Sequence, residues 1–147
     1  MRLALILLGV FVLIQLVPYG HSHGNPPVTQ EPRWDSATTK QLVADACNDC
    51  HSNLTTWKWY SNVAPASWLV QRDVDSGRGV LNFSEWNKPQ PSAGEVSEQV
   101  RSGEMPPIQY KILHPASRLS SAERDALARG LEATYAADPP PAGGGGG

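Results

Sequence analysis

The pentapeptide Cys-Asn-Asp-Cys-His at residues 47–51 constrains this chain most, because it uses both cysteines and one of the four histidines among 147 residues. Two thiols three positions apart share one face of a helical turn, and an imidazole follows directly. Four kinds of structure use such a pattern: a disulfide, half of a zinc site, a dithiol redox pair and a covalent haem attachment site. The rest of the sequence discriminates among these four.

Three of these structures fit the remaining sequence poorly. A structural zinc site needs four ligands, and the expected core offers only His114 beyond the motif. A thioredoxin-like dithiol lies near a βαβ unit, which this sequence does not predict. A disulfide that closes so short a loop constrains the unfolded chain little, and it leaves His51 without a role.

The pattern therefore favours a c-type haem attachment site, with Cys47 and Cys50 as thioether residues and His51 as the proximal iron ligand. Two thiols on one face of a turn can reach the two vinyl groups along one edge of a porphyrin. This tether fixes the adjacent imidazole next to the iron. We expect one covalently bound haem c per chain.

The other face of the iron has two candidate ligands. Met105 is the only methionine besides Met1, and it lies in the segment Gly-Glu-Met-Pro-Pro. Gly103 is expected to end the preceding helix, and the two prolines to hold the following backbone extended. His114 is interpreted as a structural histidine, with iron ligation as the alternative. We predict Met105 as the distal ligand, because Met/His ligation is typical of cytochromes c.

Apolar residues recur at helical spacing in several segments, and none alternates as in a strand, which predicts an all-α fold. The first helix is expected to run through the cysteine motif and to end around residues 51–53. The last two helices each begin with a Ser-x-x-Glu capping box. The four expected helices begin near Ser36, Pro65, Ser92 and Ser120. We expect a small cytochrome c-like helical domain packed around the haem, preceded by an N-terminal apolar helix.

Aromatic residues are numerous for so small a domain, and we expect them to pack around the porphyrin, which supplies apolar area that a short chain lacks. They are Trp57, Trp59, Tyr60, Trp68, Phe83 and Trp86. Arg72, Arg78 and the indole N–H groups are the candidate partners of the haem propionates.

The two ends of the chain predict the domain boundaries. Residues 1–20 contain an apolar run of about 25 Å as a helix, at the short limit for a bilayer span. It is a signal peptide or a membrane anchor, and the lack of an Ala-x-Ala cleavage pattern favours the anchor. Residues 21–34 form a proline-rich linker, residues 35–136 the haem-binding domain and residues 137–147 a disordered Pro/Gly tail.

Several motifs together resemble one known family. The segments CNDCHSN, WKWYSNVAPASWLVQRDVDSGRGVLNFSEW, SGEMPP and LHPASRLSSAER resemble the small exported haem-binding domain family of bacteria, over about residues 31 to 135. These proteins are monohaem, c-type cytochrome-like and carry a single C-x-x-C-H. The resemblance implies haem at Cys47, Cys50 and His51, and Met105 matches the M-P-P segment of the family. It leaves the physiological reaction open.

These expectations combine into a function. The formal net charge of −2, without a Lys/Arg cluster, gives no indication of a nucleic-acid partner. The N-terminal segment predicts an exported domain at the periplasmic side of the inner membrane, anchored there or soluble after cleavage. We expect a one-electron carrier that works with respiratory redox proteins, since no nucleophile–base pair stands out. The alternative is a haem enzyme or sensor for peroxide or a gas, with an open or labile distal site and His114 as its acid–base candidate.

Overall fold

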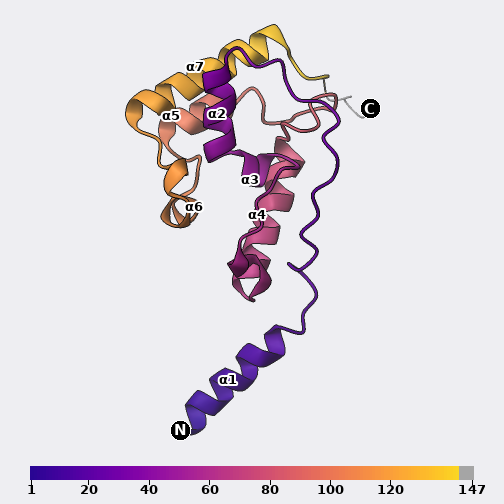
Figure 1. Cartoon of the computed structure of the whole chain (residues 1–147), viewed down its shortest axis with the longest axis vertical. Helices are drawn as coiled ribbons and strands as arrows, with labels where there is room; N and C mark the ends of the chain where they lie inside the picture. The colour runs from indigo at the N-terminus through magenta and orange to yellow at the C-terminus, as the bar shows by residue number, and fades with distance from the viewer. Residues whose placement is uncertain (143–147) are drawn as a thin grey trace.

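The computed structural model describes residues 1–142, and its regular elements are helices. In this part of the chain the one β-type pairing is an isolated bridge between Gln30 and Glu85, so the predicted all-α fold is confirmed. Figure 1 shows a helical body from which the N-terminal helix projects. The helices are α1 (Arg2–Ile14), α2 (Ala37–Ala46), α3 (Asn48–His51), α4 (Ala66–Val80), α5 (Val96–Ser102), α6 (Ile108–Leu113) and α7 (Ser121–Ala137), with 3₁₀ turns η1 (Trp59–Asn62) and η2 (Pro115–Ser117).

The expected first helix is divided into two. Ser36 caps α2 as predicted, and its hydroxyl accepts a hydrogen bond from the backbone N–H of Thr39 at 3.1 Å. At Cys47 the backbone leaves the helical region, with φ −123° and ψ −35°. The cysteine motif therefore lies on a separate single turn, α3, which ends at His51 within the predicted range.

The region around α5 and α6 contains two corrections. Glu95 is itself the N-cap of α5 and no side chain caps the helix, so the predicted capping box with Ser92 is wrong. Gly103 ends α5 as expected, in the left-handed conformation with φ 80°. The extended backbone expected after the prolines is limited to Pro107, because this residue is the N-cap of α6. The sequence pattern missed α6 because this helix buries none of its residues.

The longest helix, α7, begins where the sequence predicts. The Ser120 hydroxyl accepts from the backbone N–H of Glu123, and the Glu123 carboxylate accepts from the backbone N–H of Ser120, which completes the capping box. Leu127 and Leu131 are buried, while Tyr135 at the next four-residue step is exposed. The buried face of α7 is therefore shorter than its apolar pattern.

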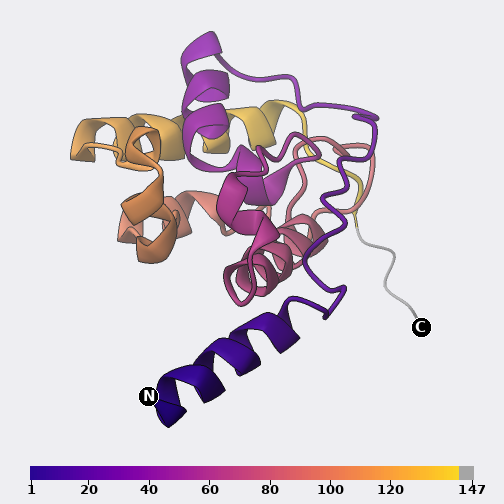
Figure 2. The ribbon, with the colours of Figure 1, turned by 60° about the horizontal axis from the view of Figure 1, so that its bottom comes forward.

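An apolar core lies between α2, α5 and α7, and Figure 2 shows α5 beside α7. A glycine brings α2 and α7 together, since a Cβ at Gly130 would overlap the side chain of Thr39. Phe83 and Trp86 stack here with ring centroids 5.9 Å apart. Trp59 is 77% exposed. Of the six aromatic residues expected around the cofactor, only Tyr60 lines the cavity described below, so the expectation is wrong for most of them.

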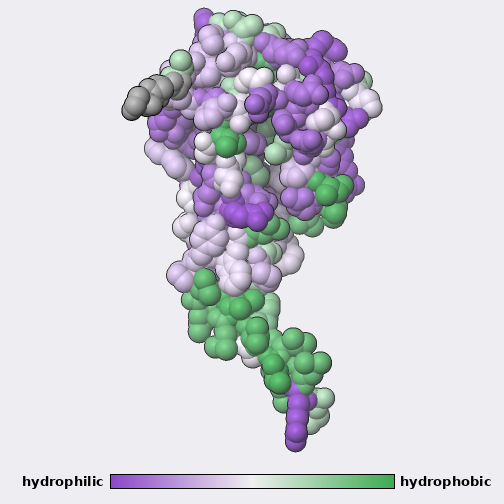
Figure 3. Space-filling model, turned by 180° about the vertical axis from the view of Figure 1, so that it is seen from behind, coloured by the Kyte–Doolittle hydropathy of each residue, from purple (hydrophilic) through white to green (hydrophobic). Residues whose placement is uncertain are grey.

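The N-terminal helix α1 stands apart from this core, and Figure 3 shows its apolar surface exposed. It ends at Ile14, earlier than the apolar run that predicts it. In residues 1–142 no helix combines the length and the apolar character needed to cross a membrane. The amide group of Gln15 exchanges two hydrogen bonds with the backbone of Ala64, which ties the end of α1 to the loop before α4.

The predicted linker, residues 21–34, has no helix and lies along the domain. His23 is half-buried and stacks on Trp57 at 4.7 Å, whereas His21 is exposed. The predicted C-terminal tail begins at the end of α7, and its last residues, 143–147, lie outside the described residues.

Candidate functional site

One cavity of about 440 Å³ collects the residues that the sequence predicts as the site. It lies between α3, α4, η1 and α6, and its walls are mostly apolar. Its lining includes Cys47, Cys50, His51, Met105 and His114. Residues more than fifty positions apart along the chain thus line the same space, and its volume is in the range of cofactor sites.

His51 is fixed by the end of α4. Its Nδ1 lies 3.1 Å from the carbonyl oxygen of Gly77 and 3.1 Å from that of Leu81. Because carbonyl oxygens only accept, Nδ1 carries the hydrogen and Nε2 keeps a free lone pair. Burial lowers the pKa of His51, against the two backbone hydrogen bonds, which favours this neutral form. A neutral imidazole with an oriented Nδ1–H is the usual form of a metal-ligating histidine.

Both cysteines are free thiols on the same turn. Burial raises the pKa of Cys47 to about 12, with a smaller contribution from Cys50. It also raises the pKa of Cys50 to about 12, assisted by the charge of Asp73. With pKa values raised in this way, both side chains are protonated thiols at neutral pH, unlike the thiolate of a reactive redox pair.

The turn packs tightly against α4 through a glycine. A Cβ at Gly77 would overlap the carbonyl oxygen of Cys50, so only glycine allows this approach. The same close packing brings the Gly77 carbonyl within reach of His51. Gly77 therefore both supports the thiol turn and orients the imidazole.

Met105 lies on the loop between α5 and α6 and is 39% exposed. Its backbone N–H donates to the carbonyl oxygen of Gln99 at 3.0 Å, which folds the loop back onto α5. The thioether is the one methionine side chain that lines the cavity. Met105 thus lines the same cavity as the cysteine motif, and its ligation of iron stays a prediction.

His114 has partners at both ring nitrogens. Its Nδ1 donates to the backbone oxygen of Tyr110 at 3.0 Å, and its Nε2 lies 3.0 Å from the hydroxyl of Tyr60. The imidazole also stacks on the Tyr110 ring at 3.8 Å. In this arrangement neither nitrogen is free for a metal, which agrees with the interpretation of His114 as a structural histidine.

The sequence analysis missed a second group of cavity residues. Asp49, in the middle of the cysteine motif, accepts a hydrogen bond from the Tyr110 hydroxyl at 2.7 Å. Burial raises the pKa of Tyr110, and the Asp49 carboxylate raises it further, so the phenol stays a donor. Burial also raises the pKa of Tyr60. No sequence signal links these residues, because the spacer positions of a C-x-x-C-H motif accept many residue types and α6 has no apolar pattern.

None of the predicted propionate partners lines the cavity. The guanidinium of Arg78 donates to the carbonyl oxygens of Ser52 and Gly24, at 2.8 and 2.9 Å, and to the side chains of Asn25 and Thr55. It fastens the linker to the motif and does not line the cavity. Arg72 and Trp68 line a separate apolar groove against Val17 and Tyr19.

The residues present fit a covalently attached haem. The cavity supplies apolar walls, two reduced thiols on one turn, an imidazole nitrogen with a free lone pair and a thioether. This set of donors is soft and imidazole-based, as haem iron requires, and it lacks the ligand count of a structural zinc site. Among the described residues no cluster of three or more His, Cys, Asp or Glu side chains forms a metal site.

Comparison with known proteins supports haem binding. A family model described as a haem-binding domain matches residues 9–133, which include all of the cavity residues. Neither the curated proteins nor the solved structures gave a match to the chain.

Proposed function

The chain belongs to the haem-binding domain family, and we propose that it carries one haem c on Cys47 and Cys50 and acts as a one-electron carrier. A bound haem supplies the ferric–ferrous couple that such a role requires. The observation that carries the proposal is the gathering of both thiols, His51 and Met105 around one apolar cavity.

Each of these residues has a defined part. Cys47 and Cys50 are reduced, which is the state that thioether formation requires. His51 presents Nε2 as the proximal donor, because Nδ1 is held by the two carbonyl oxygens. Met105 supplies the distal thioether, and Met/His ligation raises the reduction potential. With both residues as ligands, a bound haem would have no open coordination position, which suits electron transfer more than catalysis.

The cellular setting belongs to the same proposal and is supported by the sequence alone. Residues 1–20 direct the chain through the inner membrane and are then retained as an anchor or cleaved. The domain works at the periplasmic side, with respiratory redox proteins as partners.

Two measurements test the cofactor and its ligands. A pyridine haemochrome spectrum of the purified holoprotein reports a thioether-bound haem, and Cys47→Ser with Cys50→Ser should leave only extractable haem. In the ferric protein, Met105→Ala should abolish the sulfur-to-iron absorption band and lower the potential. The lowering should be a sizeable part of the roughly 0.8 V range that axial ligands set. Leu113→Ala, which trims the same wall without removing a thioether, is the control. An unchanged band in Met105→Ala would contradict the ligand assignment.

A haem enzyme or sensor is the second candidate, and the exposure of Met105 favours it. A weakly enclosed thioether leaves the distal position more open to a gas or to peroxide. The Tyr60 and His114 side chains line the same cavity and supply hydrogen-bonding groups. A high-spin ferric spectrum of the wild type, or tight carbon monoxide binding without displacement of Met105, would support this function over electron transfer.

A further inference from the structure

The helix α6, which follows Met105, forms one wall of the cavity, and we call it the distal wall. It has no apolar side chain that is fully buried. None of the side chains of α6 is fully buried: Tyr110 is half-buried, and the three large aliphatic residues, Ile108, Ile112 and Leu113, are exposed. Helices in small proteins are ordinarily held by a buried apolar face. The position of α6 over the cavity therefore depends on other contacts.

Local hydrogen bonds join α6 to its flanking segments. The Lys111 ammonium donates to the carbonyl oxygen of Gly103. Arg118 donates to the carbonyl oxygens of Lys111 and Ile112.

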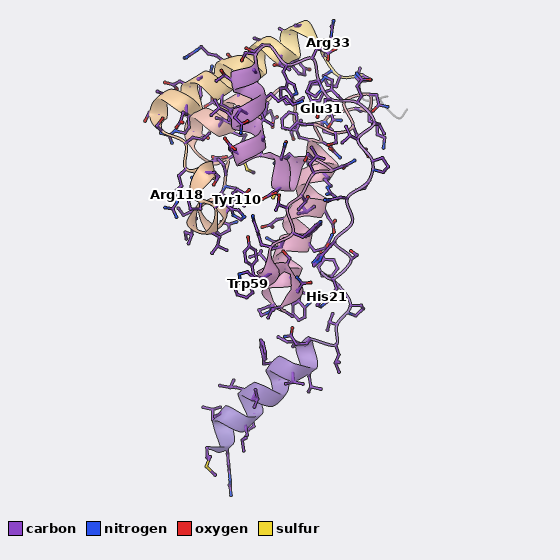
Figure 4. All side chains as sticks on the ribbon, in the orientation of Figure 1. His21, Glu31, Arg33, Trp59, Tyr110 and Arg118 are labelled. Atoms are coloured by element: carbon purple, nitrogen blue, oxygen red, sulfur yellow. The ribbon has the colours of Figure 1, made fainter. Side chains whose placement is uncertain are left out.

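Two further side-chain hydrogen bonds cross to the other walls of the cavity. The Tyr110 hydroxyl donates to Oδ2 of Asp49 at 2.7 Å, and Nε2 of His114 lies 3.0 Å from the Tyr60 hydroxyl. Figure 4 shows Tyr110 between α6 and the turn that carries the cysteines. Both bonds connect α6 and its end to the opposite side of the same cavity. The bond to Asp49 is charge-assisted, so it is the stronger of the two.

The acceptor of the stronger bond is itself fixed. Oδ1 of Asp49 accepts from the backbone N–H of Thr56 at 2.8 Å, and the backbone oxygen of Asp49 accepts from the Thr55 hydroxyl at 2.8 Å. Asp49 lies between Cys47 and Cys50. The proximal motif thus holds the distal wall directly, through a carboxylate in a spacer position.

We propose that Asp49 and Tyr110 form a latch that holds α6, and with it Met105, closed over the cavity. Only Pro106 and Pro107 separate Met105 from α6, and proline fixes φ, so movement of α6 moves the thioether. Both residues are positioning residues, because they act through Met105. The inference rests on the proposed ligation by Met105 and adds what keeps that ligand in place.

When the latch is weakened, an added ligand should displace Met105 from the iron more easily. An external ligand binds only when Met105 has left, so its apparent affinity rises by the factor by which the closed state is weakened. The loss of a hydrogen bond to a charged group corresponds to a factor of roughly ten to a hundred.

The test is an imidazole titration of the ferric holoprotein, followed by the sulfur-to-iron band. Tyr110→Phe should lower the apparent Kd for imidazole roughly ten- to a hundredfold, while Tyr135→Phe, which removes an exposed phenol from α7, should leave it unchanged. Tyr60→Phe, which removes the weaker bond, should lower it roughly two- to tenfold. In a Met105→Ala background, Tyr110→Phe should have no effect on the Kd.

The outcomes separate the latch from the ligand assignment. Wild-type imidazole affinity in Tyr110→Phe, with the band lost in Met105→Ala, would overturn the latch and leave the ligation in place. An equal gain from Tyr110→Phe with and without Met105 would mean that Tyr110 only restricts access, which also overturns the latch. A band that survives Met105→Ala would overturn both proposals.

Discussion

The domain has two sides that are closed by different forces. The side formed by α2, α5 and α7 is closed by apolar packing, and Leu127 at its centre is 0% exposed. The cavity side, between α3, α4 and α6, is closed at its distal wall by hydrogen bonds, and no residue of α6 is buried. Apolar packing is dense and resists local opening, whereas a wall held mainly by hydrogen bonds opens at lower free energy. The comparison indicates that stability is concentrated on one side and adaptability on the other.

The largest effect is expected when one aliphatic side chain on each side of the domain is truncated to alanine. Leu127→Ala should lower the free energy of unfolding by about 2–5 kcal/mol, since it leaves a hole in a packed core. Ile112→Ala on α6 should change it by less than about 0.5 kcal/mol, because that side chain is 62% exposed and does not line the cavity. Urea denaturation of the two holoproteins measures both values. Similar losses in the free energy of unfolding at the two positions would contradict the difference between the two sides.

The close contact between α3 and α4 is tested at two glycines of α4. Gly77→Ala should lower the free energy of unfolding by about 1–3 kcal/mol, because its Cβ would overlap the Cys50 carbonyl and push α3 away. It should also shift the ferric spectrum, since the same residue orients His51. Gly79→Ala meets no neighbouring atom and serves as the matched control. Equal stability of the two variants would mean that α3 adapts to the added methyl group.

The smallest expected effect concerns the start of α7. The Glu123 carboxylate accepts hydrogen bonds from the Ser120 hydroxyl and backbone N–H, and these lower its pKa. A carboxylate with a lowered pKa stabilises the folded state above its ordinary pKa, and this contribution is lost as the pH falls below about 4.5. Glu123→Gln should therefore flatten the fall in stability as the pH drops below about 4.5.

Thermal unfolding at several pH values measures this effect, with Glu104→Gln as the control for the loss of one surface charge. On the cavity side, α6 begins at Pro107 without a side-chain cap, so its start offers no comparable carboxylate. An unaltered pH profile in Glu123→Gln would show that the capping box contributes nothing to this difference.

The sequence predicts the packed side of the domain better than it predicts the wall of the cavity formed by α6. The caps at Ser36 and Ser120 and the apolar face with Leu127 are local signals, and they locate α2 and α7. The cysteine motif and Met105 were predictable as parts of one site, because few residues of a 147-residue chain carry such chemistry. The helix α6 and the bond from Tyr110 to Asp49 were not predictable. A helix without an apolar face has no periodic pattern, and a bond between residues 61 positions apart has no local signal.

The hydrogen bonds of His51 have an electronic consequence. Gly77 and Leu81 supply carbonyl oxygens at the C-terminal end of α4, where the helix dipole concentrates negative charge. The His51 ring is thus a capping group of a fifteen-residue helix as well as a donor to the cavity. Negative charge at Nδ1–H makes Nε2 a stronger electron donor. In the proposed haem site, small changes in how α4 ends would therefore tune the redox potential without any change of ligand.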